Sequence, residues 1–210
     1  MTAPLTLADI ADVRAYERER PAFRAAVIEL KRRRRVALGP VVSVVFEHRD
    51  TVRFQVQEMA RAEGLVTDAA IQHELDTYNP MVPGPGWCCA SVLVELTTPE
   101  EVREWLRALV GIERHLVLRL PGDAEVRGVP ADRRWGHRAR PDVTAAVHLV
   151  RFDVTADALV GGGPGADAEG DVGVVLASDH PAYAAATTLP AATVAELVAD
   201  VAGGPVPPSP

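Results

Sequence analysis

The segment that most constrains the fold is residues 41–47, VVSVVFE, because its apolar and β-branched side chains fall on both faces of an extended strand. Alternation puts Val42, Val44 and Phe46 on one face and leaves Glu47 at the end of the strand, where the chain turns. A strand that is apolar on both faces lies in the middle of a sheet and is covered on both sides. The sequence therefore predicts a sheet with this strand at its centre.

Two helices are predicted directly after this strand. The first spans about residues 50–63, with Asp50 or Thr51 as its N-cap and Gly64 as its C-terminal stop. The second spans residues 68–78, DAAIQHELDTY, and ends at an Asn-Pro dipeptide. Because the loop between them is short, we expect the two helices to pack antiparallel.

The rest of the chain mixes strands and helices without a regular βαβ pattern. We expect a single α+β domain over residues 1–202, built on a mainly antiparallel or mixed sheet with packed helices. Residues 161–171 are predicted to be a flexible loop and residues 203–210 a disordered tail. Further helices are expected at 7–17, from Pro21 to the basic residues 31–35, at 98–111 and at 191–201, and further strands at 36–38, 89–96, 115–120, 125–129, 144–154 and 172–176.

Composition excludes several classes of function. The chain carries 29 acidic against 22 basic residues, so no nucleic-acid partner is expected. No signal peptide is recognised and no apolar run approaches the roughly 20 residues of a membrane span, so no membrane association is expected. The two cysteines, Cys88 and Cys89, are adjacent and offer no disulfide framework, which indicates a cytoplasmic protein. Neither GxGxxG nor GxxxxGK[ST] occurs, so no nucleotide cofactor is expected.

Carboxylate and imidazole groups are concentrated on the predicted helix pair. Glu58, His73 and Glu74, with Glu47 at the strand end, are candidate ligands for iron or manganese, since non-haem sites are built from such groups on packed helices. In this hypothesis Glu58 is a ligand or general base and His73 a ligand, and both are candidate catalytic residues. Neither ExxH nor HExxH occurs around them. The alternative is structural: Glu58 pairs with an arginine such as Arg33 or Arg35, and His73 bonds a backbone carbonyl.

The basic run at residues 31–35 has two interpretations. It is typical of a solvated helix end, where cations oppose the negative end of the helix dipole. It could instead bind an anionic substrate or an acidic partner. The candidate substrate-binding residues in that case are Arg33, Arg34, Arg35, Gln55, Tyr78 and Asn79.

The two cysteines also allow two interpretations. They could form a redox pair or thiolate ligands. Adjacent cysteines at the start of an apolar strand are more often small hydrophobic residues of a core.

Three phrases of the sequence, YERERPAFRAAVIELKRRRRVALGP, FEHRDTVRFQVQEMARAE and IQHELDTYNPMVP, resemble the bacterial DUF3501 family of unknown function. The likeness is densest over residues 16–83, and it departs from the family at His48, where Asn is expected. Genes of that family commonly stand beside those for a rubrerythrin-like protein and a heterodisulfide-reductase-like iron-sulfur protein. The resemblance therefore implies a small redox system.

Three functions follow as expectations. The resemblance implies an accessory protein that docks to a rubrerythrin-like protein or an iron-sulfur oxidoreductase, and a homo-oligomer is possible. The residues alone suggest as an alternative a metal-dependent oxidoreductase or oxygenase that acts on an anionic small molecule. A third alternative is a small-molecule binding module whose pocket is lined by the same polar cluster.

Overall fold

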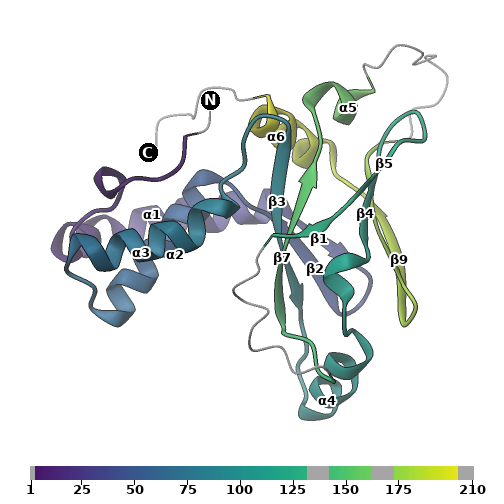
Figure 1. The fold of residues 1–210 in the computed structure, drawn as a ribbon, viewed down its shortest axis with the longest axis horizontal. Coiled ribbons are helices and arrows are strands. Elements are labelled where there is room, and N and C mark those ends of the chain that lie inside the picture. Colours follow the sequence, from purple (N-terminus) through teal and green to yellow (C-terminus); the bar gives the residue numbers. More distant parts are fainter. Residues whose placement is uncertain (1–2, 132–141, 162–172, 203–210) are drawn as a thin grey trace.

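The computed structural model describes residues 3–131, 142–161 and 173–202. Over these residues the chain has the predicted α+β fold, in which a layer of helices packs beside two antiparallel sheets (Figure 1). The expected loop at 161–171, except Gly161, and the expected tail at 203–210 lie outside the described residues.

The first sheet has the strand order β1-β2-β3-β7-β6, with all neighbours antiparallel. Its second strand is the segment predicted to be central, and all five of its residues are buried. Val44 pairs with Val36 on one side and Val92 on the other. The strands are β1 (Arg35–Leu38), β2 (Val42–Phe46), β3 (Trp87–Val94), β7 (Val147–Asp153) and β6 (Val129–Pro130).

The second sheet has the order β5-β4-β8-β9 and is also antiparallel. Its strands are β5 (Glu125–Arg127), β4 (Leu116–Arg119), β8 (Val175–His180) and β9 (Tyr183–Thr188). Strands β4 and β5 lie at two of the predicted strand segments and pair as an antiparallel hairpin. Strand β8 extends beyond the predicted segment, and β9 was not predicted, because its small residues carry little apolar signal of their own.

One continuous apolar core lies between the sheets. It contains Phe46 and Phe152 from the first sheet and Leu118 and Leu176 from the second. Tyr183 of β9 ties the sheets together, since its hydroxyl donates a hydrogen bond of 2.5 Å to the carbonyl of Leu38 in β1.

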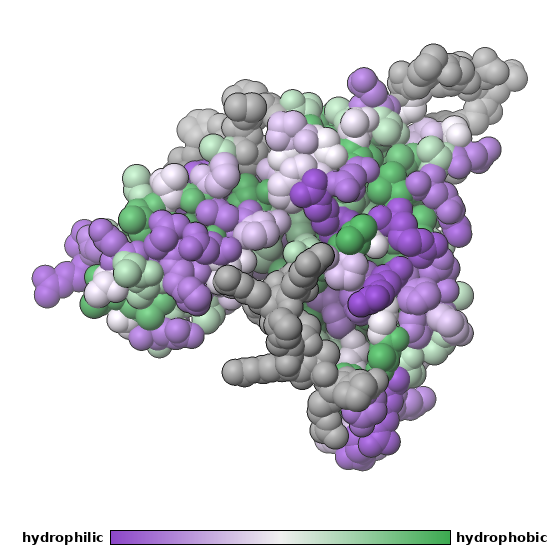
Figure 2. All heavy atoms as spheres, viewed as in Figure 1, coloured by the Kyte–Doolittle hydropathy of each residue, from purple (hydrophilic) through white to green (hydrophobic). Residues whose placement is uncertain are grey.

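The helical layer consists of α1 (Val13–Arg34), α2 (Arg49–Glu63) and α3 (Asp68–Tyr78) (Figure 1). Helix α3 has the predicted bounds, and Gly64 ends α2 in the left-handed conformation with φ 66°. The N-cap of α2 is His48 and not Asp50 or Thr51, because the His48 Nδ1 atom accepts the Asp50 N–H at 3.1 Å. The outer face of this layer carries mostly hydrophilic side chains (Figure 2).

The N-terminal region corrects a prediction. Two helices, at 7–17 and from Pro21, were expected, but one helix runs unbroken through Pro21. Proline costs this helix a hydrogen bond, yet Tyr16, Phe23 and Val27 form one buried face on both sides of it. Packing of that face outweighs the local cost. Before it lies a single 3-10 turn, η1 (Leu7–Asp9).

Three further helices complete the described chain: α4 (Pro99–Ala108), α5 (Ala156–Val160) and α6 (Ala191–Val201). Helix α4 begins with a capping box, in which Thr98 accepts the Glu101 N–H and the Glu101 side chain accepts the Thr98 N–H. Short 3-10 turns follow α3 and α4, at η2 (Asn79–Met81) and η3 (Ile112–Arg114). Within the described residues, no helix is long and apolar enough to cross a membrane.

Candidate functional site

Glu58 lies on the face of α2 that packs against α1, and its carboxylate is fully engaged. Arg20 donates to it twice, at 2.7 and 2.9 Å, and the Tyr16 hydroxyl donates at 2.7 Å. Arg61 approaches more distantly, with Nη2 3.5 Å from Oε2. The hydrogen bonds from Arg20, Tyr16 and Arg61 lower the pKa of Glu58 to about 2, against the effect of burial. The carboxylate is therefore ionised and paired at neutral pH.

The other metal candidates do not join Glu58. His73 is exposed on α3 and Glu74 is half-buried. Glu47 is buried at the end of β2, where one carboxylate oxygen accepts from Ser91 at 2.5 Å and the other from Thr51. Among the described residues, no group of three or more His, Cys, Asp or Glu side chains is placed to hold a metal ion.

The donor set consequently does not fit iron or manganese. A metal bound by Glu58 would have to displace the bidentate Arg20, and one bound by Glu47 would have to displace two hydroxyl donors. The structural alternative holds for Glu58, but with Arg20 and Arg61 in place of Arg33 or Arg35.

The basic run does not form a single surface. Arg34 is only 1% exposed and reaches α6, where it donates to Asp200 at 2.6 Å and to Glu196 at 2.9 Å. Its neighbour Arg33 pairs with Glu196 at 2.7 Å, and Arg35 pairs with Glu95. The interpretation as a solvated helix end is wrong for Arg34, because its side chain is buried against partners on α6.

His48 completes this buried ionic cluster. Its Nε2 lies 4.0 Å from Asp200, and its pKa is lowered, first by burial and then by the charge of Arg34. The pKa of Asp200 is raised, mainly because the carboxylate is removed from water, although Arg34 opposes this. The cluster is a closed network that fixes α6 against the end of α1.

The remaining substrate-binding candidates serve internal contacts. The Asn79 side chain accepts the Leu5 N–H at 2.7 Å and donates to the Leu5 carbonyl at 2.9 Å, which fixes the N-terminal segment. Tyr78 is buried, and burial raises its pKa although a hydrogen bond with Gln55 opposes this. The structure therefore does not bring the predicted site residues to one open site.

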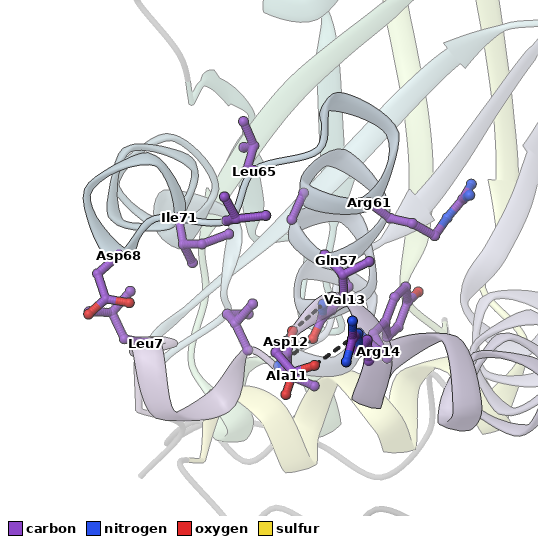
Figure 3. Close-up of a pocket in the computed structure, with 14 residues that line it drawn as sticks. Leu7, Ala11, Asp12, Val13, Arg14, Gln57, Arg61, Leu65, Asp68 and Ile71 are labelled. Carbon is purple, nitrogen blue, oxygen red and sulfur yellow. Dashed lines mark hydrogen bonds between the residues drawn. The ribbon is translucent and has the colours of Figure 1, made fainter.

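A cavity that the sequence did not predict lies between η1, the first turn of α1, α2 and the connection to α3 (Figure 3). Its volume is about 370 Å³. Part of its wall is held by Gln57, which is 2% exposed and bonds both the N–H and the carbonyl of Ala11, at 2.7 and 3.2 Å. The lining is apolar at Leu7, Ile10, Ala11, Val13, Ala60, Leu65, Val66 and Ile71 and polar at Asp12, Arg14, Tyr16, Gln57, Arg61 and Asp68.

Arg61 has an unusual environment in this wall. Its Nε atom is buried without a hydrogen-bond partner, which among the described side chains holds for only one other polar atom, Glu113 Oε2. Buried donors are normally satisfied, and this atom has no accessible surface through which the cavity could supply an acceptor. In the sequence, the signal that could have pointed to Arg61 is its position three residues after Glu58, on the same face of α2.

The model of the family described as "Protein of unknown function (DUF3501)" matches residues 4–201. The chain belongs to the DUF3501 family. The resemblance read from its sequence phrases is thereby confirmed.

Two other proteins are similar to this DUF3501 protein. A crystal structure of a protein of unknown function from Burkholderia pseudomallei K96243, at 1.90 Å resolution, matches 95% of this chain and 100% of its own, with a TM-score of 0.81 and 30% identity. Fluorothreonine transaldolase of Streptantibioticus cattleyicolor is 37% identical over 107 residues. That match covers 47% of this chain and 14% of the transaldolase, so about half of the DUF3501 protein is similar to a small part of that enzyme.

The cysteines of this DUF3501 protein are core residues. Cys88 and Cys89 are both 0% exposed. Burial is the main cause that raises both thiol pKa values, for Cys89 to about 12. Because the thiolate is the reactive form, neither side chain is placed for thiol exchange at neutral pH. The interpretation as small hydrophobic residues fits this environment.

Proposed function

We propose that this DUF3501 protein is a small-molecule binding module whose ligand occupies the cavity beside α1, α2 and α3. The observation that carries the proposal is the cavity of about 370 Å³, whose lining combines apolar side chains with a few polar groups. Ligand sites commonly have volumes of about 300–1,000 Å³, mostly apolar walls and a few placed polar groups. The lining of this cavity has that character.

The titratable groups near the cavity support binding without turnover. A general base at neutral pH needs a pKa near 7, whereas hydrogen bonds, from Arg20 first, lower the pKa of Glu58 to about 2. Burial and the charge of Glu58 raise the pKa of Tyr16 well above its usual range, so the phenol stays protonated. The pKa values of Glu58 and Tyr16 therefore suit hydrogen bonding and ion pairing, and they do not suit proton transfer at neutral pH.

The match to part of a longer enzyme is consistent with this proposal. The region in common covers 14% of the fluorothreonine transaldolase. A segment of that size can serve as a binding module within a catalytic chain. In this proposal the DUF3501 protein delivers or senses its ligand beside an enzyme.

Docking to a rubrerythrin-like protein or an iron-sulfur oxidoreductase stays a prediction. The buried, protonated thiols of Cys88 and Cys89 make thiol exchange with such a partner unsuitable as the link. Co-purification of the chain with either partner at micromolar concentration supports that prediction, and failure to capture both counts against it.

The binding function is tested by thermal unfolding of the full chain against a set of small neutral molecules, amines and carboxylates. A ligand that binds the folded state raises the melting temperature. Leu7→Trp places a larger side chain in the cavity wall and should abolish the shift, since Leu7 lines the cavity and is 37% exposed. Ile28→Trp is the matched control, because Ile28 is 49% exposed on α1 and does not line the cavity. Absence of any shift sensitive to Leu7→Trp overturns the function.

A further inference from the structure

Among the edge strands of the described sheets, β9 alone combines length with a lack of charge. Strand β6 has two residues, one of them Pro130, and β5 has three, with Glu125 and Arg127 at its ends. Strand β1 has four residues and begins at Arg35. Short length, charge and proline keep sheet edges from pairing with other chains. Strand β9 has six residues, Tyr183–Thr188, and none of these protective features.

The backbone of β9 presents hydrogen-bonding groups on the side away from β8. In an antiparallel ladder, the N–H and C=O of one residue point to the same side, and that side alternates along the strand. The Asp179 N–H donates to the His115 carbonyl, on the β4 side, so Ala184, which is opposite Asp179 in the register, points away from β8. The Leu189 N–H donates to the residue before β8, so the preceding Thr188 also points away.

Alternation therefore gives three outward residues, Ala184, Ala186 and Thr188, and all three are exposed. Among the described residues, none forms a hydrogen bond with the backbone N–H or C=O of these three. Figure 1 shows β9 at the outer edge of the second sheet, on the side of the molecule opposite α1, α2 and α3. This edge is open to a further strand.

The three outward residues are spaced so that a second copy of β9 pairs with all of them. A two-fold axis at Ala186 makes the strands of the two copies antiparallel. Ala186 then pairs with the same residue of the other copy, and Ala184 pairs with Thr188. Each pair exchanges both backbone hydrogen bonds, so every outward donor meets an acceptor.

The side chains of β9 also suit pairing with an identical strand. Like charges directly opposite each other in an antiparallel pair are destabilising. Residues 184–188 are three alanines and two threonines, which are small and uncharged, so two copies meet without repulsion. The pairing ends beyond them, because the Ala182 N–H already donates to His180 Nδ1 at 3.2 Å and Pro190 has no N–H.

We infer that β9 is the interface of a homodimer of this DUF3501 protein, in which the second sheets of two copies join into one continuous sheet. The inference is independent of the proposed binding function, because no residue of β9 lines the cavity. Stable interfaces bury about 800 Å² on each partner, and one short strand offers less. The dimer is therefore reversible, with a Kd on the order of 10 µM.

Sedimentation velocity of the full chain, from roughly 1 to 500 µM, tests for this dimer. The mass should rise from that of one chain to that of two across the range. Amide hydrogen exchange at both ends of the range locates the interface. The amides of Ala184, Ala186 and Thr188 should exchange more slowly at the high concentration, because pairing protects them.

Variants at the axis assign the dimer to β9. Ala186→Pro removes an N–H that points away from β8, so the pairing of β8 with β9 keeps its hydrogen bonds. Ala186→Lys places two like charges opposite each other and serves if the proline variant does not fold. Each should raise the Kd of the dimer about tenfold or more. Ala195→Lys is the matched control, since Ala195 is an exposed alanine on α6, and it should leave the Kd unchanged.

Three outcomes overturn the inference. The first is a chain that stays monomeric over the whole concentration range. The second is a dimer whose Kd is the same in Ala186→Lys as in the Ala195→Lys control, because its interface then lies elsewhere. The third is slow exchange of the three outward amides at every concentration, which would mean that a segment of the same chain occupies the edge. None of these outcomes affects the binding function, which depends on Leu7→Trp.

Discussion

Helix α1 supplies an arginine to each of two ionic clusters, and the two clusters differ in burial. In the helical cluster, Arg20 and Glu58 keep 29% and 23% of their side chains exposed. In the C-terminal cluster, Arg34 and Asp200 keep 2% and 7%. The pKa of Glu58 is lowered, chiefly by the hydrogen bond from Arg20, whereas the pKa of Asp200 is raised by burial. The pKa of a carboxylate paired with an arginine is thus lowered in one cluster and raised in the other.

The difference shows that solvent access decides how an ion pair affects the pKa of its carboxylate and the stability of the fold. Near the surface, a carboxylate keeps part of its hydration and its partner dominates the pKa. In the interior, loss of hydration offsets the attraction, and the pair becomes sensitive to loss of either member. The helical cluster is therefore expected to stabilise the ionised state, and the C-terminal cluster to fix the position of α6.

Arg34→Ala is expected to have the largest effect. It leaves the charges of Asp200 and Glu196 in the interior without their guanidinium, and loss of one partner of a buried pair costs about 3–5 kcal/mol. Urea unfolding followed by circular dichroism measures this. The matched control is Arg33→Ala, which removes a neighbouring partner of Glu196 that is 45% exposed and should cost less than about 1 kcal/mol. Equal losses of unfolding free energy in the two variants would contradict the view that burial decides how much an ion pair contributes to stability.

Neutral replacement of the whole C-terminal cluster sharpens the comparison. Arg34→Met combined with Glu196→Leu and Asp200→Leu removes the charges together, so no unpaired charge stays buried. Such replacements are often neutral or stabilising, and the triple variant should recover most of the stability that Arg34→Ala loses. A triple variant less stable than Arg34→Ala contradicts the account, as measured by the same unfolding titration.

Glu58→Gln tests the helical cluster and its pH dependence. At pH 7 we expect a loss of about 1–3 kcal/mol, because hydrogen bonds to an ionised carboxylate are lost. The folded pKa, about 2, lies below the ordinary glutamate pKa of 4.5, so this stabilisation is present above about pH 4.5 and is lost as the pH falls towards 2. The difference between wild type and variant should shrink over that window. A difference independent of pH would show that packing, and not charge, is lost.

The smallest effect is expected for an exposed pair outside both clusters. Arg127 donates to Asp179 at 2.6 Å, but the two side chains are 53% and 44% exposed. Exposed pairs contribute little because both groups stay hydrated. Arg127→Ala should leave the urea midpoint unchanged within error. A clear shift of the midpoint would mean that a short ion-pair distance, and not burial, determines how much the pair contributes to stability.

Much of the local structure followed from the sequence. The interior strand β2 lies where its apolar side chains indicate it, and helix α3 has the predicted bounds. These signals act within a few residues, so they are readable without knowing the fold. The continuity of α1 through Pro21 was missed, because the face that buries Phe23 exists only once α2 is packed against it.

The contacts at the candidate site could not be predicted from local sequence signals. The sequence by itself determined that this is an α+β chain with polar, charged helices around α2, and its phrases identified the family. The tertiary structure alone decided that Glu58 pairs with Arg20, that Arg34 is buried against Asp200, and that Arg61 lines a cavity with residues of α1 and α3. Residue type sets what a side chain can bind. The partner it actually meets, and the water it loses, depend on packing between segments far apart in the chain.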